Sequence, residues 1–94
     1  MWVLTMNNEM INVSRAERII LKQETDEVGG ESVKPNAGGE MVGVSIVAQF
    51  ADRAVQLAFI PAAANYDLVV SRYWNALRTA IKARAEIVDL MDIA

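Results

Sequence analysis

The spacing of apolar residues along the chain changes near Pro61. Before this residue, apolar side chains occupy every second position along two runs, Val42–Phe50 and Val55–Phe59. A period of two is typical of β-strands that bury one face. The two runs predict an antiparallel hairpin that turns at Ala51–Arg53. Pro61 ends its second strand because proline has no N–H to donate to a neighbouring strand.

After Pro61 the apolar residues recur every three to four positions. They are Val70, Tyr73, Trp74, Leu77 and Ile81. This spacing is typical of one amphipathic helix, which we predict over residues 66–84 with this stripe facing the core. Asn65 or Asp67 can cap its start.

Shorter apolar runs lie at the two ends of the chain. They predict strands at Trp2–Met6, Met10–Ser14 and Ala16–Gln23, with a turn at Asn7–Glu9 and a short final strand within Glu86–Met91. The predicted fold is therefore α+β: a bent antiparallel sheet of five to six strands with one C-terminal amphipathic helix packed on it. Residues 1–94 are expected to form a single domain.

Residues 24–40 differ in composition from the rest of the chain. This segment holds four glycines, Pro35 and five acidic residues against a single Lys34. We expect a long, acidic, flexible loop. Glu24 and Asp26 match the first calcium-ligand positions of an EF-hand, but Pro35 stands where that loop requires a glutamate, so no specific metal site is predicted. A domain that senses a cation or small ligand through this loop is the alternative function.

The chain of 94 residues contains no cysteine and no histidine, and its net charge is −3. The commonest general base and zinc ligand are therefore missing, and no broad basic surface for nucleic acid is expected. We predict neither an enzyme nor a bound cofactor. The longest apolar stretch, residues 41–64, is interrupted by charged and amide side chains, so we expect no membrane insertion and a cytoplasmic protein.

Aromatic residues supply the remaining candidates. Phe50 and Phe59 fall in the predicted inward register of their strands. Trp74 lies at the edge of the helical stripe, next to Tyr73. A large aromatic residue there is either half-buried in the monomer or an anchor for a partner, since Trp and Tyr are enriched in interface hot spots. Tyr73, Trp74 and Val70 form the candidate interface. The leading hypothesis is a non-enzymatic protein-interaction or assembly module that binds a protein partner or a second copy of itself, as a homodimer.

The segment Met10–Leu21, with Met1-Trp2 upstream, resembles a recurring opening in small uncharacterised proteins of bacteria and their phages. That resemblance implies no particular activity. The order of elements is also similar to a reduced pleckstrin-homology-like half barrel, closed by a C-terminal helix. Phosphoinositide-binding members of that group use a basic first hairpin, whereas the turn here is Asn7-Asn8-Glu9, which argues against lipid-headgroup binding.

Overall fold

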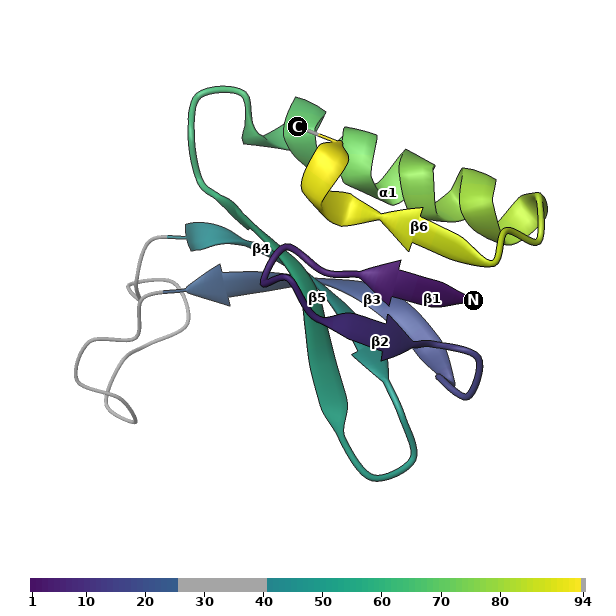
Figure 1. The fold of residues 1–94 in the computed structure, drawn as a ribbon. Helices are drawn as coiled ribbons and strands as arrows, with labels where there is room; N and C mark the ends of the chain where they lie inside the picture. The colour runs from purple at the N-terminus through teal and green to yellow at the C-terminus, as the bar shows by residue number, and fades with distance from the viewer. Residues whose placement is uncertain (26–40, 94) are drawn as a thin grey trace.

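The strands and the helix predicted from the two spacings are present in the computed structural model, which describes residues 1–25 and 41–93. The strands are β1 (Trp2–Leu4), β2 (Met10–Asn12), β3 (Arg18–Thr25), β4 (Met41–Gln49), β5 (Ala54–Pro61) and β6 (Ile87–Asp89) (Figure 1). The helix α1 spans Tyr66–Lys82 and ends two residues before the predicted boundary; a short 3-10 helix, η2, covers Leu90–Asp92. The α+β class is confirmed. Within the predicted loop at 24–40, Glu24 and Thr25 belong to β3, and the rest lies outside the described residues.

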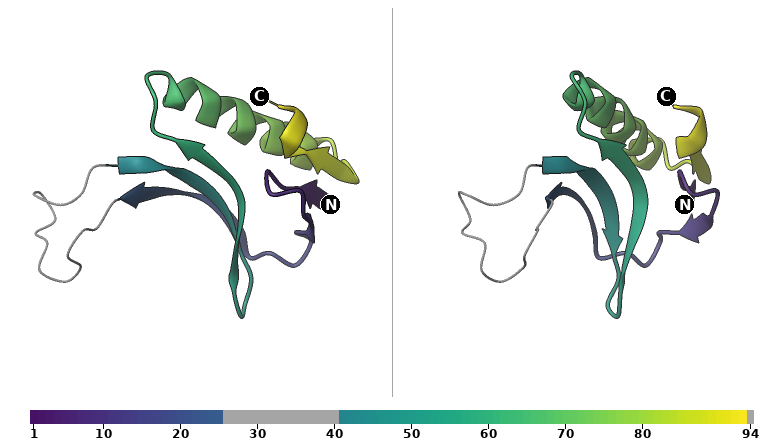
Figure 2. Two further views of the ribbon diagram at one scale, coloured as in Figure 1. Left: turned by 60° about the vertical axis from the view of Figure 1, so that its left-hand side comes forward. Right: turned by 90° about the vertical axis from the view of Figure 1, so that its left-hand side faces the viewer.

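The strands form two sheets rather than the single bent sheet predicted. One sheet has the order β2-β1-β6 and the other has the order β3-β4-β5. Of the four strand pairs among the described residues, three are antiparallel, while β1 and β6 run parallel. Figure 2 shows that the strands of the β3-β4-β5 sheet bend strongly, and that α1 and the smaller sheet lie on one side of them.

The break between the sheets follows from the connection between β2 and β3. The backbone N–H of Val13 donates to the Met1 carbonyl at 3.0 Å, and the N–H of Ala16 donates to the Val13 carbonyl at 3.0 Å. The second bond turns the chain away from β2. The N–H of Glu17 then donates to Gln49 at 2.7 Å and starts the pairing of β3 with β4. The second neighbour of β1 is therefore β6, from the far end of the chain.

A β-bulge in β5 overturns the predicted inward position of Phe59. Ala58 pairs with Ile46, but Val47 pairs with Gln56, so Leu57 has no residue opposite it. Leu57 and Ala58 both face the core, and the alternation is reversed from there on. Phe59 consequently lies on the opposite face of the sheet. Phe50, before the bulge, packs against the core as predicted.

Helix α1 packs one face against both sheets, and its buried residues are Tyr73, Leu77 and Ala80. Ile81, predicted in the core stripe, is 52% exposed. In the last turn of α1 the buried face is occupied by the small Ala80, and Ile81 lies beside that face rather than on it. At the other end, Asn65 is the N-cap residue without a capping side-chain bond, whereas Asp67 Oδ1 accepts from the Leu68 N–H at 3.0 Å.

One core is shared by α1 and the two sheets. Its buried members are Val3, Val13, Ile46, Ala48, Leu57, Ala58, Ile60, Tyr73, Leu77 and Leu90. Residues from both ends of the chain, such as Val3 and Leu90, are completely buried in it. This arrangement leaves the outer face of the small sheet and the C-terminal end of α1 available for function.

Candidate functional site

The three residues predicted to form an interface lie on α1 and differ in exposure. Tyr73 is 3% exposed and belongs to the core. Trp74 and Val70 are half-buried and pack against that core, and Val70 also lines a shallow hollow with Leu21 and Val44. Tyr73 thus offers almost no surface to a partner in this structure, and the other two offer part of their side chains. An interface at Trp74 and Val70 stays a prediction.

A different surface carries larger exposed apolar side chains. On the outer face of the β2-β1-β6 sheet, Trp2 lies between Asn12 of β2 and Ile87 of β6. The next row on this face contains Met10 of β2 opposite Leu4 of β1. Trp2 is 46% exposed, Met10 is 47% exposed and Ile87 is 54% exposed. We call this surface, formed by Trp2, Leu4, Met10 and Ile87, the Trp2 face.

The Trp2 face forms because successive residues of a strand point to opposite sides of a sheet. Val3 lies in the core with Ile11 and Val88 as its neighbours in β2 and β6, so Trp2 must point outward. A hollow of about 410 Å³ lies beside Trp2, Met10, Glu86 and Ile87. Its lining combines an indole, a thioether and a branched aliphatic group with one carboxylate.

The charged residues differ between the two sides of the Trp2 face. Asn12, opposite Trp2 in β2, lines a separate hollow with Arg15, Asp52 and Arg53. The residues beside Met10 and Ile87 are acidic. Glu86 lines the hollow, and exposed Glu9 precedes Met10 in the chain. Asp89 lies opposite Leu4 on the same face, although its Oδ1 already accepts from the Met91 N–H at 2.8 Å. A Lys or Arg does not occur among the outward residues of the three strands. The side of this surface around Met10 and Ile87 therefore favours a contact that carries positive charge.

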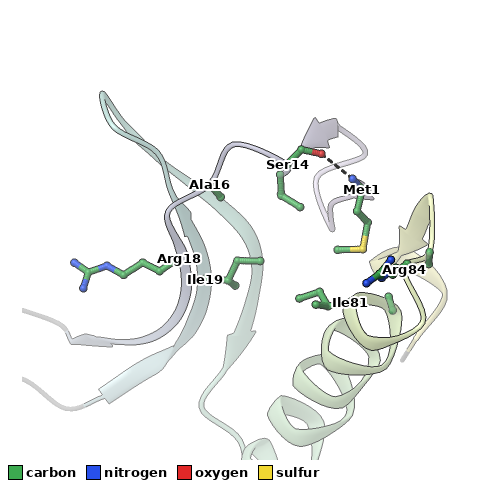
Figure 3. A pocket seen from close by; sticks show the side chains of 10 residues that line it. Met1, Ser14, Ala16, Arg18, Ile19, Ile81 and Arg84 are labelled. Atoms are coloured by element: carbon green, nitrogen blue, oxygen red, sulfur yellow. Dashed lines mark hydrogen bonds between the residues drawn. The ribbon is translucent and has the colours of Figure 1, made fainter.

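A second hollow lies where the C-terminal end of α1 approaches the β2–β3 connection (Figure 3). We call it the helix-end groove; its volume is about 400 Å³. Ala16 and Ile19 form one wall, and Ile81 and Arg84 form the other beside the Met1 side chain. The Met1 amino nitrogen donates to Ser14 Oγ at 2.9 Å at its edge, and Figure 3 shows this bond.

Arg84 reaches the helix-end groove from an unusual backbone conformation. Its φ angle is 54°, in the left-handed region. Its N–H donates to the Ile81 carbonyl at 3.1 Å, and the Ala85 N–H donates to the Ala80 carbonyl at 2.9 Å. This pair of bonds is the Schellman motif that closes many helices, with Arg84 at the position where glycine is usual. By contrast, the Arg18 side chain points away from the groove, and its Nε donates to Gln49 Oε1.

Comparisons with known protein families, with curated proteins and with solved structures return no match for this chain. The resemblances to small bacterial and phage proteins and to a pleckstrin-homology-like half barrel therefore stay predictions. No helix in the described ranges is long and apolar enough to cross a membrane. Among residues 1–25 and 41–93, no three acidic side chains are grouped so as to hold a metal ion. Most of the acidic segment considered for cation sensing lies outside those ranges.

Neither surface was singled out from the sequence. Alternation within Trp2–Leu4 already implies that Trp2 and Val3 point in opposite directions, but not which of them is outside. The proximity of Ile87 depends on a strand pair that joins the two ends of the chain. For the helix-end groove, the available signal was the absence of a glycine after Lys82, where a helix of this length commonly has one.

Proposed function

We propose that this chain is a non-enzymatic protein-interaction module that contacts its partner through the Trp2 face. The observation that carries the proposal is the half-exposed group of Trp2, Met10 and Ile87 on one side of a three-stranded sheet. Single exposed apolar residues are ordinary, but contiguous ones are uncommon on monomeric proteins and mark contact surfaces. Tryptophan and methionine are also enriched in such surfaces.

The chemistry of the residues supports a contact role rather than catalysis. The Trp2 face holds apolar groups and carboxylates, and the chain has no histidine or cysteine to serve as base or nucleophile. A rigid sheet presents its side chains without the entropic loss that ordering a loop on binding would require. The proposed activity is therefore binding alone.

The acidic border indicates the kind of partner. In a two-fold dimer through the Trp2 face, this surface would pack against the same surface of a second copy. Glu86 and Glu9 of one chain would then lie near the acidic border of the other. Like charges brought together in an interface oppose association. The partner that fits best is a different protein whose apolar anchor is flanked by Lys or Arg. The homodimer considered from the sequence is the competing outcome.

Site-specific photo-crosslinking in the native cell tests the proposal. A photoreactive residue replaces Met10, and the control carries the same residue at Leu68, which is 60% exposed on α1, away from the Trp2 face. We expect an adduct of defined mass from position 10 that is absent from position 68. The additional change Ile87→Asp should abolish this adduct without unfolding the chain.

The mass of the adduct identifies the occupant. A mass of twice the 10.3 kDa chain, together with a dimer in light scattering over a concentration series, would show self-association and overturn the hetero-partner. Adducts of equal yield at positions 10 and 68, or none at position 10, would refute the Trp2 face as a contact surface.

A further inference from the structure

Arg84 occupies a position in which an L side chain is unfavourable. Its φ angle of 54° brings Cβ close to the following carbonyl, which glycine avoids. The Schellman bonds around it would form equally well with glycine. The backbone therefore gives no reason for arginine at this position, and an observed outlier of this kind points to a role for the side chain.

Compensation of the helix dipole does not supply that role by itself. A cation near the C-terminus of a helix is favourable, but Lys82 already lies in the last turn of α1 in an ordinary helical conformation. Arg84 itself is exposed rather than buried against the helix end. Its guanidinium instead lies with Ile81 on one wall of the helix-end groove.

The lining of the groove defines the chemistry of a ligand. Ile19, Ala16 and Ile81 offer aliphatic contacts, whereas the Arg84 guanidinium presents N–H donors that match a carboxylate in a bidentate arrangement. Ile81 is left 52% exposed there, although the helical spacing places it near the core stripe. The volume of about 400 Å³ is at the lower end of the range for small-molecule sites.

We propose that the helix-end groove binds a small aliphatic carboxylate, with the tail against Ile19 and Ile81 and the head on Arg84. The positive guanidinium beside an apolar wall is complementary to an anionic head on an apolar tail. This site is separate from the Trp2 face, and the proposal does not depend on the protein-interaction function.

Octanoate titration followed by backbone amide NMR of the full chain tests the proposal. With about ten non-hydrogen atoms, octanoate is expected to bind with a dissociation constant on the order of millimolar. The shifts should centre on Ala16, Ile19 and Ile81. Octanol, which has the same tail without the charge, should bind about twofold to fivefold more weakly.

Three variants separate the ligand role of Arg84 from a structural one. Arg84→Gln should weaken octanoate binding about twofold to fivefold, whereas Arg78→Gln, on an exposed part of α1, should leave it unchanged. Arg84→Gly should weaken octanoate binding as much as Arg84→Gln does. It should nevertheless unfold at a urea concentration equal to or higher than that of the unsubstituted chain, because glycine adopts the left-handed conformation without strain. Equal binding of octanol and octanoate, unchanged binding by Arg84→Gln, or shifts centred elsewhere would overturn the proposal.

Discussion

Gly43 in β4 tests the bulged register of β5 directly. A Cβ atom at this position would lie 2.5 Å from the Ile60 carbonyl oxygen, 2.5 Å from Phe59 Cζ and 2.7 Å from Phe59 Cε1. Carbon contacts below 3.0 Å are essentially never tolerated. The Phe59 ring can move aside, but the Ile60 oxygen belongs to the strand backbone, so Gly43→Ala must displace β4 from β5.

The magnitude follows from two opposing terms. Overpacking of a tight site destabilises by about 1–3 kcal/mol. The loss of glycine's freedom in the unfolded chain offsets about 0.4–1 kcal/mol of that. We therefore expect Gly43→Ala to lower the free energy of unfolding by about 1–2 kcal/mol. For a domain of this length this corresponds to a Tm lower by about 5–15 °C.

Urea unfolding followed by circular dichroism measures this change, and a double-mutant cycle assigns its cause. In a Phe59→Ala background the ring contact is gone while the Ile60 contact stays, so Gly43→Ala should cost less there but still destabilise. A neutral or stabilising Gly43→Ala would refute the close approach. An identical cost in both backgrounds would show that the Phe59 ring moves aside freely and that the Ile60 carbonyl oxygen alone sets the cost.

Two further substitutions test the core and the first hairpin. Leu77→Ala removes a side chain that is 1% exposed and should lower the free energy of unfolding in urea by about 2–5 kcal/mol. Leu68→Ala, at a 60% exposed position, should change it by no more than about 0.5 kcal/mol. Equal effects would contradict the orientation of α1. Thr5 is fully buried and its Oγ1 accepts from two turn N–H groups at 3.2 Å, so Thr5→Val should cost about 1–2 kcal/mol by thermal unfolding, against little change for the exposed Thr79→Val.

The local elements could be predicted because each one is encoded in a short stretch of sequence. The period of two in Val42–Phe50 and the helical spacing after Pro61 both correspond to observed elements. The turn at Asn7–Glu9 is also confirmed, with Asn8 at a φ of 62°, a conformation that asparagine tolerates better than most residues.

The assembly of the strands could not be predicted in the same way. A single unopposed residue, Leu57, reverses the faces of Phe59 and Ile60, and the alternating pattern of residues 54–60 fits both registers. The parallel pairing of β1 with β6 joins Val3 to Val88, and nothing in the spacing of either short strand specifies this partner. The sequence therefore predicts the elements of this fold but not the division into two sheets.

Both candidate surfaces depend on the meeting of the two ends of the chain. The Trp2 N–H donates to the Glu86 carbonyl at 2.7 Å. Trp2 and Glu86 line the hollow of the Trp2 face, and the residues just before them, Met1 and Ala85, line the helix-end groove. Leu90 holds the C-terminal segment in place because it is fully buried. Opening of β6 alone would remove Ile87 from the first surface and loosen Arg84 in the second. The parallel seam between β1 and β6 is thus the structural element on which both proposed binding activities rest, and its stability sets an upper limit on how long either surface persists.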